Sequence, residues 1–219
     1  VEADHYIQAY EQIEQYLGLI DDKVGQLSYF EALTALGFSI FADAPVDVAV
    51  IEVGLGGELD ASNIVEPVIT VITPIGMDHQ SYLGNDLTSV ARAKAGILKS
   101  GAIPVLARQQ LPAAEVIALR CAELGLPMLR EGVEFGIIER QLAVGGQMLT
   151  MQGIGGDYSE VLLPLYGEHQ ASNASVALTA VEAFFGAATQ LDVDTVRSAF
   201  AGTSSPGRCE VVRRSPTVI

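Results

Sequence analysis

Residues 68–73 read VITVIT, and this stretch decides the fold of the 219-residue chain. Its β-branched residues favour an extended backbone, and a continuous apolar run is typical of a strand that is covered on both faces of a sheet. The runs VDVAVIEV at 46–53 and IPVLA at 103–107 have the same character. Helical patterns at 86–98 and 112–124 separate or follow these strands. This alternation predicts right-handed crossovers and a mainly parallel sheet.

Helical patterns also precede and follow this core. Apolar residues at helical spacing predict a first helix over 4–17. The capping box SYFE at 28–31 opens a helix over 29–43, which is apolar around much of its circumference and is therefore expected to be buried. Two more helices are expected at 170–185 and 193–200.

The section from 134 to 165 has a different character. Short strand-like runs alternate there with Gly-Gly pairs, which predicts an antiparallel meander added to the sheet. These strands are expected at 135–138, 141–144, 148–151 and 161–165. The predicted fold class is α/β: three layers, with a mainly parallel sheet flanked by helices and the meander added. Residues 204–207, SSPG, are the best linker candidate.

The composition excludes several classes of protein. The 12 Lys and Arg oppose 27 Asp and Glu, so the formal net charge of −15 would repel nucleic-acid phosphate. No apolar run approaches the roughly 20 residues that span a bilayer. Cys121 and Cys209 have the spacing neither of a metal site nor of a disulfide framework, which favours a reducing cytosol. Because the chain starts at Val1 rather than Met, we expect it to be a piece of a longer protein.

The charge is unevenly spread along the chain. No Lys or Arg occurs from 24 to 91, and residues 1–66 carry 13 acidic side chains against the single Lys23. Solvated acidic helix faces account for most asymmetries of this kind. A sharper interpretation is that some of these carboxylates meet a cation in an assembled site. The charge pattern alone leaves both interpretations open.

A glycine-rich turn follows the run at 46–53. Residues 52–63 read EVGLGGELDASN, which places Glu52 at the predicted carboxyl end of a buried strand, where ligands of open α/β sheets collect. The glycines permit close approaches that other residues forbid. The turn is not a P-loop, because no Lys and Ser/Thr follow at the required positions. A tight turn with Glu52 emerging into water fits the local pattern about equally well.

His79 and Lys94 are two further candidates. His79 follows the strand at 68–73 and would share a rim with Glu52 if their strands are neighbours, and both side chains can bind a divalent cation. Lys94 has small neighbours in ARAKAGI, and partial desolvation there favours a neutral, nucleophilic amine. Considered singly, a loop histidine with one hydrogen bond and a surface lysine are the plainer interpretations.

The sequence GEHQASN at 167–173 begins a predicted helix. Polar amide and imidazole groups at the amino end of a helix can contact a nucleotide or phosphate. They can as readily be ordinary caps. The local pattern does not choose between the two.

The motifs in combination are more specific than any one of them. They are YFE at 29–31, EVGLGG at 52–57, LDASN at 59–63, DH at 78–79, LG at 83–84, KAGI at 94–97, GEHQ at 167–170, Asn173 and PGR at 206–208. Together they resemble folylpolyglutamate synthase/dihydrofolate synthase of the Mur ligase superfamily, over nearly the whole chain. Members of that family carry a P-loop before this region and a second α/β domain after it. The resemblance therefore implies an N-terminally incomplete central ATPase domain at 1–205, with a linker and the start of the next domain at 206–219.

The resemblance also implies an activity, an ATP-dependent amide ligase of folate biosynthesis and one-carbon metabolism. A dihydropteroate or reduced folate carboxylate takes the γ-phosphate, and the amine of L-glutamate attacks the acyl phosphate. Mg²⁺ would be bound by Glu52, His79 and a carbamylated Lys94, with Lys94 and His79 catalytic. The residues expected near the nucleotide are Asn173, His169, Gln170 and Arg208. The full-length enzyme is expected to be a cytoplasmic monomer, and this piece to be inactive alone.

Two positions depart from the family pattern. Glu58 stands where Arg is usual, and Ala93 stands where Glu is usual before the modified lysine. These departures support a degenerate binding module of the same fold that lacks turnover. Another Mur-type ligase, which extends a cell-wall precursor, is a further alternative, although the EVGLGG motif favours a folate ligase.

Overall fold

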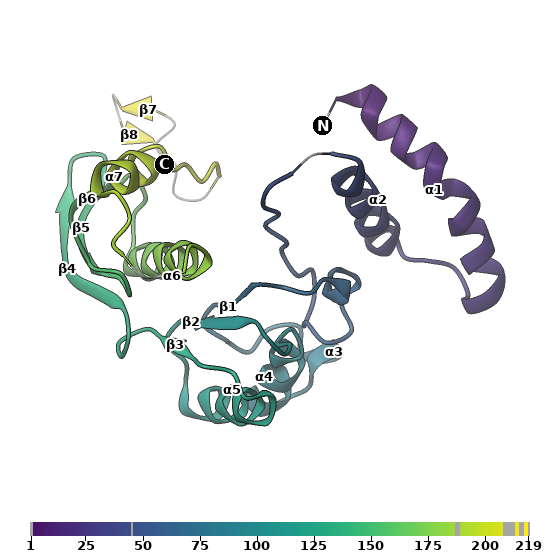
Figure 1. Ribbon diagram of the computed structural model, residues 1–219, viewed down its shortest axis with the longest axis horizontal. Coiled ribbons are helices and arrows are strands. Elements are labelled where there is room, and N and C mark those ends of the chain that lie inside the picture. Colours follow the sequence, from purple (N-terminus) through teal and green to yellow (C-terminus); the bar gives the residue numbers. More distant parts are fainter. Residues whose placement is uncertain (1, 45, 187–188, 208–212, 215–216, 219) are drawn as a thin grey trace. The chain divides into compact units, whose positions relative to one another are not determined.

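The computed structural model describes residues 2–44, 46–186, 189–207, 213–214 and 217–218. The chain divides into two compact units, Val1–Val65 and Glu66–Ile219. The first unit is mostly helical, and the second contains the strands (Figure 1). Among the described residues, no helix is both long enough and apolar enough to cross a membrane.

Two helices make up most of the first unit. α1 spans Ala3–Val24 and so continues well beyond its predicted end, whereas α2 spans Tyr29–Asp43 as expected. The capping box is present: the Glu31 amide donates to Ser28 Oγ (3.2 Å), and the Ser28 amide donates to Glu31 Oε2 (2.7 Å). These bonds satisfy amides that the first turn leaves free, so α2 begins where the sequence indicates. A short 3₁₀ turn, η1 at Ala61–Ile64, contacts α2.

Residues 46–53 are the main departure from the expected fold. The predicted strand is wrong: this described segment is irregular, and the Val50 side chain is 92% exposed. Apolar β-branched residues favour an extended backbone, but a strand also needs a partner for its amides and carbonyls, and the first unit contains none among its described residues. The expected burial of α2 is also wrong. Of its residues only Leu36 is buried, because the unit offers little else for its apolar faces to pack on.

A parallel three-stranded sheet confirms the predicted architecture in the second unit. β1 (Ile69–Ile72), β2 (Ile103–Leu106) and β3 (Leu129–Arg130) pair in the order β1-β2-β3. Two of the predicted helices cover one face: α4 (Leu87–Ala95), capped by Asp86, and α5 (Leu111–Leu124). A four-residue helix, α3 (Gln80–Leu83), lies between β1 and α4 in the chain. The core on this face includes Ile72, Val90, Leu106 and Ile117, each 5% exposed or less.

The antiparallel meander forms a sheet of its own. β4 (Gly136–Ala143), β5 (Gly146–Gln152) and β6 (Asp157–Leu163) pair in sequence order and do not join β1–β3. The prediction of an addition to the parallel sheet is therefore wrong in this detail. β4 also merges two of the runs that were expected as separate strands, because a bulge after Ile137 lets one strand continue through both.

Helix α6 (Glu168–Phe184) joins the two sheets. It contacts β1 and β2 on one side and β4 and β5 on the other, and Figure 1 shows it between them. Val176 packs into the core beside the parallel sheet, whereas Ala174 and Leu178 pack into the core beside the meander. The parallel sheet thus lies between α4 and α5 on one face and α6 on the other, which gives the three predicted layers. Helix α7 (Val193–Ala201) covers β6, and β7 (Arg213–Arg214) pairs with β8 (Thr217–Val218).

Candidate functional site

The glycine-rich turn of the first unit is held closed by Asp60. Its carboxylate accepts hydrogen bonds from the Leu55 amide (2.8 Å), the Ser62 amide (2.9 Å) and the Ser62 hydroxyl (2.5 Å). Burial raises the pKa of Asp60, but the hydrogen bonds from Ser62, Leu55 and Gly54 outweigh this effect and hold the pKa below its ordinary value. The ionised carboxylate of Asp60 therefore organises the turn. The sequence motif LDASN includes Asp60, but its role in closing the turn was not predicted.

Glu52 and Glu58 flank the glycines and are both exposed. Gly54 lies so close to the ring of Phe30, on α2, that an added Cβ would collide with it. The backbone carbonyl of Glu58 accepts a hydrogen bond from Asn63 Nδ2 (3.2 Å), so this contact does not depend on the side chain at position 58. Glu52 presents a free carboxylate to solvent immediately before this ordered turn. Its predicted place at a strand end is wrong, since no strand forms there among the described residues.

His79 lies beyond the carboxyl end of β1, at the amino end of α3. Its backbone is left-handed (φ 51°), an uncommon conformation for a residue with a side chain. Asp78 fixes it: the His79 amide donates to Asp78 Oδ1 (2.8 Å), and His79 Nε2 lies 3.5 Å from Asp78 Oδ2. The imidazole is 55% exposed and so remains available to a ligand.

Gln109 holds the segment that leads from β1 to His79. Its Oε1 accepts from the Ile75 amide (3.0 Å), and its Nε2 donates to the Thr73 carbonyl (2.9 Å). Gln109 follows β2, so its amide bridges the ends of two neighbouring parallel strands. Gln109 was not predicted from the sequence, because a neutral amide a few residues beyond the end of β2 carries no charge or motif signal.

Lys94 lies in the last turn of α4, half-buried between Ala93 and the buried Ala95. The role of its amine stays a prediction. Within the part of the chain that the structure describes, no three His, Cys, Asp or Glu side chains gather closely enough to hold a metal ion. Glu52 belongs to the first unit, and His79 and Lys94 belong to the second. The assignment of these three residues to one metal site therefore stays a prediction.

The amino end of α6 brings three predicted nucleotide residues onto one helical face. His169, Gln170 and Asn173 are spaced one and four residues apart, and Asn173 Nδ2 lies 3.5 Å from Gln170 Oε1. His169 and Asn173 are exposed, and Gln170 is half-buried. The preceding Gly167 provides no side-chain cap, and the first turn of α6 also carries the exposed carboxylate of Glu168.

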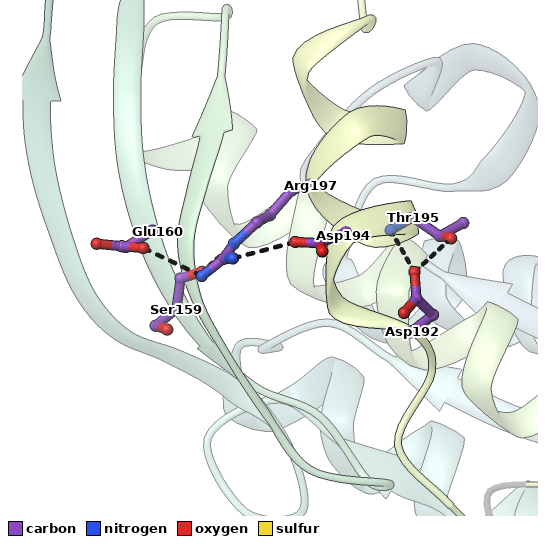
Figure 2. Close-up of polar contacts among 6 residues, drawn as sticks. All are labelled: Ser159, Glu160, Asp192, Asp194, Thr195 and Arg197. Atoms are coloured by element: carbon purple, nitrogen blue, oxygen red, sulfur yellow. Dashed lines mark hydrogen bonds and ion pairs between the residues drawn. The ribbon is translucent and has the colours of Figure 1, made fainter.

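A shallow hollow beside α7 is lined by acidic side chains, but these residues have structural partners (Figure 2). Asp192 caps the helix by accepting from the Thr195 amide (2.8 Å) and hydroxyl (2.6 Å). Arg197 pairs with Asp194 (3.3 Å) and Glu160 (3.2 Å), and its Nε donates to the Ser159 carbonyl (3.0 Å). The Arg197 contacts hold α7 against β6. Because Asp192 and Asp194 already have these structural partners, the hollow is not a candidate site.

Two residues singled out from the sequence, Arg208 and Cys209, lie outside the described residues. Cys121 is buried on α5, and desolvation raises the pKa of its thiol, which makes it a core residue rather than a nucleophile.

Comparison with known proteins identifies the family of the chain. A model of the Mur ligase middle domain matches residues 24–181. The chain belongs to this family. The chain is 47% identical, over 97% of its length, to the dihydrofolate synthase/folylpolyglutamate synthase of Mycobacterium tuberculosis. It is 36% identical over 87% of its length to the folylpolyglutamate synthase of Lacticaseibacillus casei.

Solved structures agree with these relationships. The chain superposes on M. tuberculosis folylpolyglutamate synthase complexed with ADP and AMPPCP with a TM-score of 0.93, covering 99% of this chain and 50% of that one. The apo form of the L. casei enzyme gives a TM-score of 0.90 at 32% identity, covering 96% of this chain and 52% of that one. The chain thus spans about half the length of the relatives it matches, and the α/β fold predicted from the sequence is confirmed.

Proposed function

We propose that this Mur ligase domain is the central ATP-using part of a folylpolyglutamate synthase/dihydrofolate synthase-type ligase. The enzyme would join L-glutamate to dihydropteroate or a reduced folate, in the cytoplasm, through an acyl phosphate made at the expense of ATP. The observation that carries the proposal is the 47% identity to the M. tuberculosis enzyme over 97% of the chain. Because the chain spans about half of that enzyme, the 219-residue piece is proposed to be inactive alone and the full-length protein to act as a monomer.

The nucleotide is proposed to bind at the amino end of α6. The exposed imidazole of His169 and amide of Asn173, with Gln170 between them, offer hydrogen-bonding groups that suit a purine base. Arg208 is proposed as a phosphate contact. Imidazole and amide groups would then contact the base and a guanidinium the phosphates, so two parts of the chain would share the recognition of ATP.

Glu52, His79 and Lys94 are proposed to hold Mg²⁺, which when bound neutralises charge on the transferred phosphoryl group. The donor set fits in part as it stands: Glu52 offers exposed carboxylate oxygens, and His79 offers an exposed nitrogen steadied by Asp78. A protonated lysine has no lone pair to donate, so Lys94 fits only as a carbamate, an anion with carboxylate-like oxygens. In that form Lys94 and His79 would position the reacting groups.

Carbamylation can be tested directly in the full-length protein. Incubation with carbon-13-labelled carbon dioxide is expected to give a carbamate signal in the NMR spectrum, and the Lys94→Met variant is expected to lack it. An identical signal in both proteins would exclude Lys94 as the modified residue.

The activity is tested by phosphate release. The full-length protein with ATP and Mg²⁺ is expected to release phosphate only when both glutamate and dihydropteroate or folate are added, and the 219-residue chain is expected to release none. Release with a cell-wall precursor in place of folate would establish the other Mur-type activity. Absence of release with every acceptor, despite nucleotide binding, would favour a degenerate binding module.

The departures at Glu58 and Ala93 are the observations that favour the non-catalytic alternative. The backbone carbonyl of Glu58 accepts a hydrogen bond from Asn63 in the turn, and the Glu58 side chain is exposed. The charge reversal therefore leaves this turn contact intact and would affect only what the side chain meets. The variants Glu58→Arg and Ala93→Glu, which restore the family residues, are expected to raise the phosphate-release rate if the departures limit turnover.

A further inference from the structure

Gln147 is a fully buried polar residue with a complete set of partners. It lies on β5 at 0% exposure. Its Nε2 donates to the carbonyls of Leu165 (2.9 Å) and Gly167 (3.0 Å), and its Oε1 accepts from Arg140 Nη1 (3.2 Å) on the neighbouring strand β4. A buried amide is costly unless it is hydrogen-bonded, and here both amide hydrogens are used. The residue is therefore built to hold the two carbonyls.

These two carbonyls belong to the connection from β6 into α6. Gly167 is the cap residue of α6, with φ 104° and no side-chain cap. Its carbonyl accepts the Gln170 amide (3.2 Å) from within the helix and Gln147 Nε2 from the meander sheet. The start of α6 is thus fixed from outside the helix, by one side chain on a neighbouring strand.

The cap residue in turn positions His169. A Cβ added to Gly167 would lie 2.5 Å from His169 Cε1, so the imidazole rests against the bare Cα of the glycine. Gln170 follows His169 directly, and Asn173, one turn further on, donates to Gln170 Oε1 (3.5 Å). A shift of the Gly167 peptide therefore displaces the imidazole and turns the whole face.

We propose that Gln147 is a positioning residue for base recognition: by holding Gly167, it sets the placement of His169, Gln170 and Asn173 and so the preference for adenine over other bases. The inference rests on the proposed nucleotide-binding role of α6. Discrimination by hydrogen bonds depends on partners of correct polarity at correct distance, so a displaced face loses its preference for adenine. The triphosphate meets other groups and keeps its affinity.

The test compares three variants of the full-length protein, with ATP, GTP and inorganic triphosphate as probes in calorimetric titrations. Gln147→Glu keeps the side-chain shape but places an acceptor against two carbonyls. Arg140→Met removes only the partner of Oε1, from an exposed position. Gln152→Glu makes the same chemical change at an exposed site on the same strand and is the matched control.

We expect the preference for ATP over GTP to fall about tenfold in Gln147→Glu and about threefold in Arg140→Met, and to stay unchanged in Gln152→Glu. Triphosphate affinity is expected to stay within about twofold in all three variants. A purely structural role would instead weaken all three probes equally.

Retention of the wild-type preference in both test variants, or an equal loss for every probe, would overturn the inference. If melting shows that Gln147→Glu does not fold, Arg140→Met decides alone, because its side chain is exposed. A wild-type protein that binds triphosphate but shows no preference for ATP would refute the base-recognition role. One that binds none of the probes would refute the proposed function itself.

Discussion

Replacement of Tyr158 by Phe tests how the second unit is held together. The tyrosine is 0% exposed on β6, and its hydroxyl donates to Glu182 Oε1 on α6 (2.8 Å) and accepts from the Leu191 amide (2.8 Å). Glu182 is itself buried and also accepts from the amides of Ile154 (2.7 Å) and Gly155 (3.1 Å). One hydroxyl thus ties the meander, α6 and the segment before α7 to a single buried carboxylate.

The cost of Tyr158→Phe follows from these contacts. A hydrogen bond to a charged group contributes about 2 kcal/mol, and leaving the partly buried Leu191 amide without its partner costs about 1 kcal/mol more. Phenylalanine fills the same space, so no cavity term is added. The free energy of unfolding should therefore fall by about 3 kcal/mol, equivalent to a loss of roughly 10 °C in melting temperature for a unit of this size.

Urea unfolding followed by far-ultraviolet circular dichroism is the appropriate assay, since the chain contains no Trp to report by fluorescence. Tyr82→Phe, at a side chain that is 78% exposed, is the control and should change stability by less than about 0.5 kcal/mol. A loss below about 1 kcal/mol in Tyr158→Phe would refute the idea that this network stabilises the unit.

Three further outcomes are expected. Burial and the hydrogen bond to Glu182 raise the pKa of Tyr158 from 10.0 to about 12. Its contribution to the free energy of unfolding is therefore present below pH 10 and lost as the pH rises to 12. The difference in stability between wild type and Tyr158→Phe should disappear over that range, and a constant difference would contradict the assignment. Asp60→Ala removes the acceptor for Leu55 and Ser62, so hydrogen exchange at the Leu55 amide should become faster while α1 exchange stays unchanged; equal exchange at Leu55 would count against a turn closed by Asp60. Gly146→Ala drives a Cβ into the backbone carbonyl of Leu163, so the melting temperature should fall by more than in Gly145→Ser. A Cβ at Gly145 meets open space, and only the positive φ of that residue opposes the change. Equal losses would show that the backbone around Gly146 can shift to accommodate the Cβ.

The helices and strands that were predicted correctly are those with a clear signal in their own residues. Continuous apolar runs gave β1 and β2, and side-chain caps such as Ser28 and Asp86 marked where α2 and α4 begin. Residues 46–53 carried the same apolar signal and form no strand, because pairing depends on a partner that the local pattern does not reveal. The two-residue strand β3 was missed because it is too short to show a period.

The candidate site divides in the same way. Sequence motifs singled out His79, Lys94 and the amino end of α6, because these residues lie at element ends, and their roles in a site stay predictions. Gln109 and Gln147 were missed because each acts through backbone carbonyls far away in the chain: Gln147 reaches Leu165 and Gly167, and Gln109 reaches Thr73. A neutral amide carries no charge pattern or spacing that would reveal such a contact, so only the fold exposes it.

The central claim is that this Mur ligase domain works in an enzyme that activates a folate carboxylate as an acyl phosphate. Its most direct test uses dihydropteroate or folate labelled with oxygen-18 in the carboxylate, incubated with the full-length protein, ATP, Mg²⁺ and glutamate. Amide formation through an acyl phosphate leaves one carboxylate oxygen on the phosphate, so mass spectrometry should find one labelled oxygen in each phosphate released. Formation of the amide together with unlabelled phosphate would contradict the account.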